Sequence, residues 1–406
     1  MQQIFLNYGV RLAITAISLF SSVILFCYLV DPFSAYGRIF TQENSQINSP
    51  AFTAQLRLGK AVAIAQRQPE ILIMGSSRSG LGIASASAQK YFDKKKVYNA
   101  SIPGSSSYEL LRYFQHAVAS APIEHVIIGL DFFAFNGGKP IPNEFKEERL
   151  SVDKYNTPNT SLSNKINTLL SLDALFYSLK IFINHSNWNN LYLADGFIQH
   201  GIIGGWEATF TATANDYVLS PIVGYNFPKF TFSLPKTTKT SLDHLKQIIQ
   251  LAHEKKIKLD LFISPSHARQ WEVIAQLGLW DKWEYWKREM LRITEQESIH
   301  HTASPFPIYD FSGYTHYSTE PVPKLQGAPM MKWYSDSSHY RHALGDIILE
   351  SIKSGGNTGF GTILTSKNID SHLQHIHAGH IQYAKKHQQH TDMLRKIIEK
   401  SHETKQ

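Results

Sequence analysis

The pattern of hydrophobic and polar positions divides the chain into an apolar N-terminal segment, a long region of alternating strands and helices, and a polar C-terminal tail. Short apolar runs that end in turn residues predict buried strands of a parallel sheet. They lie at 71–74, 96–100, 125–131, 258–264 and 307–311. Apolar residues at helical spacing predict helices between them, at 84–92, 108–119, 241–255, 268–296 and 341–352. This alternation predicts an α/β fold with three layers, α/β/α, in which the middle layer is a mainly parallel sheet.

The N-terminal apolar segment has the length of a membrane span. Residues 12–30 contain no charge, Gly or Pro, and a helix of that length measures roughly 28 Å, close to the ~30 Å hydrocarbon core of a bilayer. Asp31, Pro32 and Phe33 follow in place of a small-residue cleavage site, which favours a retained anchor over a cleaved signal peptide. Arg11 before the span places the N-terminus in the cytoplasm and the rest of the chain outside.

The pattern predicts four parts. Residues 1–31 form the cytoplasmic N-terminus and the transmembrane anchor, and 32–69 a linker and one amphipathic helix. Residues 70–355 form the α/β domain, in which the periodicity weakens over 132–240 and indicates a long insertion that contains one helix, at 166–183. Residues 356–406 are a linker followed by a polar, His-rich helix.

Charge and composition narrow the choice of partners. The net charge is +7, but the Lys and Arg residues are spread along the chain, which argues against nucleic acid. The single cysteine, Cys27, excludes an internal disulfide. Histidines spaced three residues apart in the tail fit either a metal clamp or a solvated helix face, and the solvated face is favoured because no carboxylate or Cys closes the coordination shell. No metal and no cofactor is expected.

Two short motifs carry the candidate chemistry. Ser76 and Ser77 follow Gly75 where the first strand ends, the edge of an open α/β sheet at which ligands bind. A serine there also caps the next helix, which is the alternative explanation. Asp336 and His339 form an Asp-x-x-His motif before the last helix of the domain, at the same edge. A serine nucleophile needs such an imidazole to take its proton and a carboxylate to orient that imidazole.

The order of these pieces resembles the SGNH, or GDSL-like, hydrolase superfamily. The matching positions are Gly75 to Ser77, Gly104, Gly129 to Asp131, and the pair Asp336 and His339. The resemblance implies a flavodoxin-like fold with Ser77 as nucleophile, His339 as general base and Asp336 as its orienting partner. It also implies an oxyanion site formed by the backbone N–H groups of Ser77 and Gly104, with a third donor at the position of Asp131.

Two positions depart from the family pattern. Ser76 replaces the usual Asp, which resembles the Gly-Ser-Ser form of DltD-type proteins, and these also carry one N-terminal membrane helix and a late Asp-x-x-His. Asp131 replaces the oxyanion Asn, and a carboxylate there would repel an oxyanion. Asp131 must therefore be protonated, turned away, or replaced by another donor such as Asn99 or Asn136.

Three residues are candidates for substrate binding: Arg78, His267 and Asn99. Arg78 follows the expected nucleophile, where it is either a clamp for an anionic group or a surface residue at a helix N-terminus. His267 follows the fourth strand, where it either lines the cleft or has a structural role.

The sequence thus favours an outward-facing serine esterase or O-acyltransferase, held in the membrane by residues 12–30, that acts on acyl, especially acetyl, esters of cell-envelope glycans. A membrane acyl-donor protein is a further candidate partner. One alternative is an inactive SGNH-like glycan-binding or assembly component of the envelope, which Asp131 favours. Another is a cytoplasm-facing lipid or thioester hydrolase, which requires the reverse topology.

Overall fold

The computed structural model describes residues 2–33, 50–92, 95–159, 171–183, 191–199, 204–220, 229–325 and 327–403. The chain forms two compact units, one of Met1–Arg67 with Asn143–Ala194, the other of Gln68–Pro142 with Asp195–Gln406. Each has its own hydrophobic cluster. The segment expected as a single insertion, 132–240, is therefore divided between the two units.

The second unit is built on a mostly parallel sheet, which confirms the α/β class. Its described strands are β1 (Ile71–Met74), β2 (Val97–Asn99), β3 (His125–Leu130), β4 (Lys258–Ile263), β5 (Ile308–Asp310) and β6 (Thr362–Ile363). They lie in the order β2-β1-β3-β4-β5-β6, with parallel pairing throughout except between β5 and β6. The five predicted strands are all present, whereas β6 falls in a stretch expected to be a linker.

One face of the sheet packs against α4 (Ser77–Gly82), α5 (Ser85–Tyr91) and α13 (His342–Lys353). Ile73 and Ile127 are neighbours in register, and they share a buried cluster with Leu344 of α13. The approach of α13 to α4 depends on Gly345, because a Cβ there would lie 1.8 Å from the carbonyl oxygen of Gly82. This packing brings the start of α4 close to the segment that precedes α13.

A second group of helices consists of α6 (Ser107–Ser120), α10 (Leu242–Glu254) and α12 (Trp280–His300), in which α10 contacts α6, α12 and β4. The predicted helix 268–296 is two helices, because α11 (Ala268–Gln276) ends before Gly278, whose φ of 67° belongs to the left-handed region. The unit also contains the 3-10 helix η1 (Phe132–Phe135) and α9 (Glu207–Leu219).

The C-terminal tail packs within the second unit as α14 (Ile369–Lys386) and α15 (Gln388–Glu403). The prediction of a solvated helix face holds for His375 and His377 of α14, whereas His372 and His380 lie partly buried against the domain. His372 Nε2 lies 2.9 Å from Asp310 Oδ2, and His380 Nδ1 lies 2.9 Å from Glu272 Oε1. Both carboxylates are buried and need polar partners. The described residues contain no group of three His, Cys, Asp or Glu side chains arranged to hold a metal.

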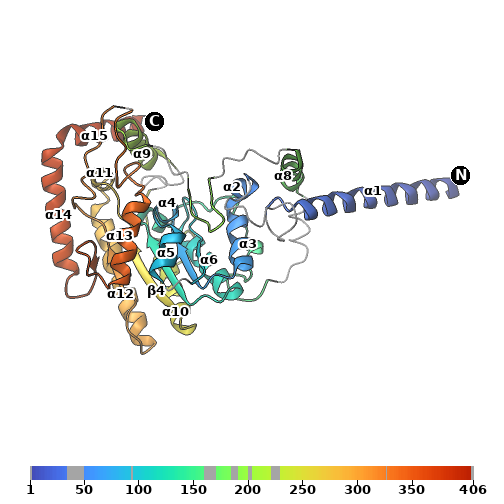
Figure 1. Ribbon diagram of the computed structural model, residues 1–406, viewed down its shortest axis with the longest axis horizontal. Coiled ribbons are helices and arrows are strands. Elements are labelled where there is room, and N and C mark those ends of the chain that lie inside the picture. The colour runs from blue at the N-terminus through green and yellow to red at the C-terminus, as the bar shows by residue number, and fades with distance from the viewer. Residues whose placement is uncertain are drawn as a thin grey trace. The chain divides into compact units, whose positions relative to one another are not determined.

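The first unit contains α1 (Gln2–Val30), α2 (Pro50–Ala54), α3 (Leu56–Arg67), the 3-10 helix η2 (Glu147–Arg149) and α8 (Leu172–Ile183). Within α1, the 24 residues Asn7–Val30 are long and apolar enough to cross a membrane, in agreement with the expected span. Figure 1 shows α8 beside the C-terminal end of α1. The helix expected at 166–183 is confirmed from Leu172 onward, and 160–170 lie outside the described residues.

Candidate active site

A tight turn between β1 and α4 places Ser77. Gly75 has a φ of 146°, and a Cβ there would lie 2.9 Å from the carbonyl oxygen of Gly129, so this position requires glycine. Ser76 caps α4 by accepting a hydrogen bond from the backbone N–H of Arg78 at 3.2 Å. Ser77 is the first residue of the helix and is partly exposed. Of the two adjacent serines, Ser76 therefore performs the capping, and the hydroxyl of Ser77 is left for other contacts.

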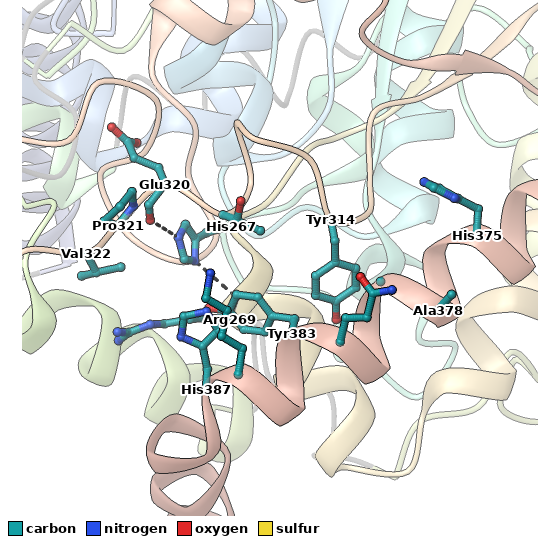
Figure 2. Close-up of a pocket in the computed structure, with 14 residues that line it drawn as sticks. His267, Arg269, Tyr314, Glu320, Pro321, Val322, His375, Ala378, Tyr383 and His387 are labelled. Atoms are coloured by element: carbon teal, nitrogen blue, oxygen red, sulfur yellow. Dashed lines mark hydrogen bonds between the residues drawn. The ribbon is translucent and has the colours of Figure 1, made fainter.

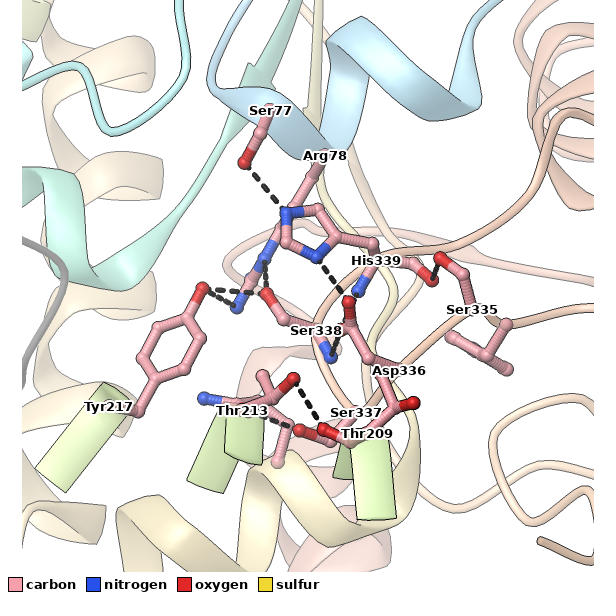
Figure 3. Close-up of polar contacts among 12 residues, drawn as sticks. Ser77, Arg78, Thr209, Thr213, Tyr217, Ser335, Asp336, Ser337, Ser338 and His339 are labelled. Carbon is pink, nitrogen blue, oxygen red and sulfur yellow. Dashed lines mark hydrogen bonds and ion pairs between the residues drawn. The ribbon is translucent and has the colours of Figure 1, made fainter. Parts of the chain in front are cut away.

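Ser77, His339 and Asp336 form a continuous line of hydrogen bonds, as Figure 3 shows. Ser77 Oγ lies 2.8 Å from His339 Nε2, although the two residues are 262 positions apart. His339 Nδ1 lies 2.7 Å from Asp336 Oδ2. Asp336 Oδ1 accepts the backbone N–H groups of Ser338, at 2.7 Å, and His339, at 2.9 Å. The spacing of Asp-x-x-His thus lets one carboxylate bind both the ring and the backbone of the histidine.

The carboxylate of Asp336 is held in its ionised form. Burial by itself would raise the pKa of Asp336, but the neighbouring His339 and the two backbone N–H groups lower it below its ordinary value. An ionised carboxylate only accepts hydrogen bonds, so His339 Nδ1 carries a proton, and in the neutral form of the ring Nε2 presents its lone pair to Ser77. This arrangement can withdraw a proton from the Ser77 hydroxyl and return it to a leaving group.

Arg78 is buried, so it is neither a surface residue nor a clamp open to substrate. Its side chain is 2% exposed and pairs with Asp131, with 3.1 Å between Nη1 and Oδ1. Its Nε donates to Ser338 Oγ at 2.9 Å, and its Nη2 donates to the Tyr217 hydroxyl at 3.3 Å. Tyr217 and Ser338 are themselves 2.6 Å apart at their oxygens. Arg78 therefore connects the Ser77 turn to the loop that carries His339.

Asp131 is the partner of Arg78 and Ser76. Its Oδ1 faces Arg78, and its Oδ2 accepts the Ser76 hydroxyl at 2.5 Å. A carboxylate that pairs with an arginine supplies no hydrogen-bond donor to an oxyanion. Of the possibilities that the sequence left open, the structure thus favours an Asp131 that is turned to other partners, and the expectation of an oxyanion role is corrected.

Backbone N–H groups remain available near Ser77. The turn after β2 lies against Gly75, because Ile102 donates its N–H to the Gly75 carbonyl at 3.0 Å and Ser105 Oγ donates to the same oxygen at 3.3 Å. Gly104, with a φ of 65°, belongs to this turn. The N–H groups of Ser77 and Gly104 make no hydrogen bond to any residue in the described part of the chain.

The two asparagines considered as replacement donors have structural contacts. Asn99 Nδ2 donates to the carbonyls of Ser79, at 3.1 Å, and Ile83, at 2.9 Å. Asn136 Oδ1 accepts the backbone N–H groups of Gly138 and Thr231. Asn99 is fully buried and holds the α4 segment to β2, which gives it a structural place instead of one in contact with substrate.

His267 lies behind the loop that carries the Asp336–His339 pair, because its backbone N–H donates to the Ser337 carbonyl at 3.0 Å. Its Nδ1 accepts the N–H of Arg269, and its Nε2 lies 2.8 Å from the Glu320 carbonyl oxygen. Burial lowers the pKa of His267 to about 3, so the ring is neutral.

Figure 2 shows the pocket that His267 lines, a cavity of about 450 Å³. Tyr314, Tyr383 and His387 line it as well, whereas Ser77 and His339 do not. His267 is therefore grouped with a separate pocket and not with the nucleophile, so of the two alternatives that the sequence left open the structure favours the structural role.

The sequence did not reveal Tyr217 and Ser338 as members of this region. Ser338 lies inside the Asp-x-x-His motif, where its position next to His339 was the only available clue. Tyr217 lies on α9, in a stretch without clear periodicity, so only the fold brings it to Arg78.

Comparison with known proteins adds no family assignment. No protein-family model matches the chain, and no curated protein is detectably similar to it in sequence. The functional argument therefore depends on the geometry of the site.

Proposed function

We propose that this protein is a membrane-anchored serine esterase or O-acyltransferase of the SGNH type. The observation that supports it most directly is the line from Ser77 Oγ through His339 to Asp336, with successive separations of 2.8 Å and 2.7 Å. Hydrogen-bond distances of this size are those required of a nucleophile, its base and the base's orienting group.

The proposed reaction proceeds in two halves. Ser77 Oγ attacks the carbonyl carbon of an ester while His339 Nε2 takes the hydroxyl proton, and the N–H groups of Ser77 and Gly104 stabilise the oxyanion. The C–O bond to the alcohol then breaks, and His339 gives its proton to the leaving oxygen. In the second half, His339 takes a proton from water or from a sugar hydroxyl, whose oxygen attacks the acyl carbon. The bond between that carbon and Ser77 Oγ then breaks, and His339 returns the proton to Ser77 Oγ.

The fold is compatible with a three-layer SGNH arrangement. Helices α4, α5 and α13 pack on one face of the parallel sheet. In the proposed arrangement α6, α10 and α12 form the layer on the other face, which agrees with the contact of α10 with β4. Ser77 follows the first strand and Asp336 precedes the last helix of the layers, as in the DltD-like order of motifs.

The envelope location and the substrate class are part of the same proposal. A span within α1, with Arg11 before it, would place the α/β unit outside the cytoplasm. An ester hydrolase or acyltransferase anchored there would meet the acyl esters of envelope glycans, and a membrane acyl-donor protein would supply the acyl group in the transfer reaction. A reporter fused after Gln406 distinguishes this topology from the cytoplasmic alternative.

The alternative, an inactive glycan-binding or assembly component, has less support. It drew on Asp131, whose carboxylate is instead occupied by Arg78 and Ser76. An inactive protein would also have no need to keep the Ser77 hydroxyl close to the imidazole of His339. The distance between Ser77 Oγ and His339 Nε2 is nevertheless 2.8 Å, a hydrogen-bond distance.

The test is hydrolysis of p-nitrophenyl acetate by the full chain in detergent. We expect the Ser77→Ala and His339→Ala variants to lose activity by roughly 10³-fold or more, because removal of either member of such a unit leaves only residual catalysis. Ser354→Ala and His342→Ala, which alter exposed residues outside the site, serve as matched controls and should retain activity. A wild-type protein that is folded and no more active than Ser77→Ala would contradict the esterase proposal.

A further inference from the structure

Helix α8 exposes a row of large apolar side chains. Leu172, Phe176, Leu179 and Ile183 follow one another at spacings of four, three and four residues, and they are 84%, 60%, 45% and 74% exposed. This spacing places them in one stripe along the helix, which we call the α8 stripe. Phe182 beside it is 55% exposed.

Helix α8 is apolar on both of its faces, and only one of them is covered by the described part of the chain. Its fully buried residues are Ala174, Ser178 and Ile181, and the half-buried Leu175 and Tyr177 pack against the same cluster. In a water-soluble unit an amphipathic helix turns its apolar face to the core and its polar face to solvent. Contiguous exposed apolar patches mark surfaces that contact a partner or a membrane. The orientation of α8 is therefore the one expected of a helix with an apolar medium on its outer side.

The neighbour of α8 indicates which medium this is. The rings of Phe182 and Phe26 meet edge to face, with centroids 5.9 Å apart. Ala174 shares a buried cluster with Cys27 of α1. Phe26 lies four residues before the end of α1 at Val30, which corresponds to about 6 Å along the helix axis. α8 is thus level with the last turns of the helix that is apolar enough to span a membrane.

We infer that α8 is a second membrane-contacting element, which lies in the interface of the leaflet that holds the C-terminal end of α1 and presents the α8 stripe to lipid acyl chains. Interfacial helices insert their apolar faces about 5–10 Å into the boundary between headgroups and acyl chains, which matches the depth set by Phe26. If α1 were the only contact with the membrane, the first unit could rotate about the axis of α1. A second contact through α8 would fix the orientation of the first unit relative to the membrane. The inference depends on α1 spanning the membrane and not on the ester chemistry.

The experiment measures lipid exposure at single residues. The full chain carrying Cys27→Ser is reconstituted into vesicles of phosphatidylcholine and phosphatidylglycerol, with a nitroxide attached to a cysteine at one of four positions. Phe176 and Leu179 report on the α8 stripe, Phe20 on the middle of α1, and Lys396 on the exposed polar side of α15. Power saturation then compares collisions with O₂, which concentrates in lipid, with those of the water-soluble complex NiEDDA.

We expect the ratio of O₂ to NiEDDA collisions at Phe176 and Leu179 to be several-fold higher than at Lys396 and to approach that at Phe20. Water-like ratios on the α8 stripe together with a lipid-like ratio at Phe20 would overturn the inference and leave the anchor intact. Low collision rates with both reagents would mean that a protein, either a second copy or a partner, covers the stripe, which also overturns it. A water-like ratio at Phe20 would refute the anchor itself.

A second measurement avoids the cysteine replacement. The photoreactive amino acid p-benzoylphenylalanine is introduced at Phe176 or at Lys396 in the chain that keeps Cys27, and the reconstituted protein is irradiated. The same amino acid at Phe20, on α1, serves as the positive control. Phospholipid adducts detected by mass spectrometry at Phe176 and not at Lys396 support the inference, and their absence at Phe176, with adducts present at Phe20, contradicts it.

Discussion

Two polar networks meet in the loop that carries His339, and they differ in their access to solvent. The first consists of Ser77, His339 and Asp336, and it ends at a partly exposed hydroxyl. The second is entirely buried and joins Ser76, Arg78, Asp131, Tyr217 and Ser338. We call the first network open, because a substrate could reach its exposed hydroxyl. We call the second network closed, because no substrate can reach its buried groups, which stabilise the fold. Polar residues of the same kinds thus perform different tasks according to burial.

The division between the networks runs through two adjacent serines. Ser76 caps α4 and donates to Asp131, while Ser77 begins the helix and faces His339. Consecutive residues at a helix start point in different directions, so a change of one position decides between the structural contacts of Ser76 and the contact with His339 that we propose to be catalytic.

The largest effect is expected from Asp336→Asn, which tests the open network. The amide would donate to His339 Nδ1 and so favour the ring tautomer whose Nε2 carries a proton facing Ser77. We expect kcat/KM for p-nitrophenyl acetate to fall by roughly 10³ to 10⁴-fold, as the wrong tautomer cannot accept the Ser77 proton. Asp370→Asn, on an exposed carboxylate of α14 that pairs with Arg288, should retain activity. Equal activity in the two variants would contradict the role of Asp336.

The next effect is on stability and tests the closed network. Asp131→Asn leaves the buried guanidinium of Arg78 without its counter-charge, and we expect the free energy of unfolding in urea to fall by about 3–5 kcal/mol. The matched control is Asp392→Asn, which breaks an ion pair with Arg395 in which both side chains are more than half exposed. That change should cost about 0–1 kcal/mol.

The outcome of Asp131→Asn also separates the two networks. Suppose that stability falls strongly while kcat/KM stays within about tenfold of the wild-type value, a change of about 1.4 kcal/mol in the activation free energy. This outcome would agree with a purely structural role for Asp131. A normal urea midpoint combined with a collapse of kcat/KM would instead assign Asp131 to the open network, and the comparison would fail.

The smallest effect concerns His267, whose backbone N–H donates to the Ser337 carbonyl in the loop that carries His339. Its pKa is lowered by burial to about 3, whereas an unfolded histidine titrates near 6.5. Between these values the unfolded chain binds a proton that the folded chain does not, so stability is complete above pH 6.5 and falls as the pH drops toward 3. The titration of His267 should therefore lower the free energy of unfolding by about 2 kcal/mol between pH 7 and pH 5.

In His267→Gln the amide replaces the ring donor toward Glu320, and this part of the pH dependence should disappear. His342→Gln, at an exposed position, should leave the wild-type slope unchanged. Urea unfolding at pH 7 and pH 5 provides the comparison. An unchanged slope in His267→Gln would show that His267 is not held neutral by the fold.

Local pattern predicted much of the fold because each feature depends on a few neighbouring residues. The runs that became β1 to β5 are short, apolar and ended by turn residues, and α1 needs only an uninterrupted apolar stretch. The conformations of the Gly75 turn and of the Asp-x-x-His motif likewise depend on a few neighbouring residues. Ser77, Asp336 and His339 were therefore identified as one candidate set from the sequence.

Contacts between distant segments decided the rest. The partners of Arg78 and Asp131, the docking of the His-rich α14 and the exposure of the α8 stripe each depend on which segment lies opposite. A polar helix such as α14 can be partly buried when imidazoles meet buried carboxylates. An apolar helix such as α8 can leave large side chains exposed when the neighbouring helix covers only one of its faces. Hydrophobicity along the sequence determines which segments seek an apolar environment, but only the tertiary structure determines where each side chain finds its partner.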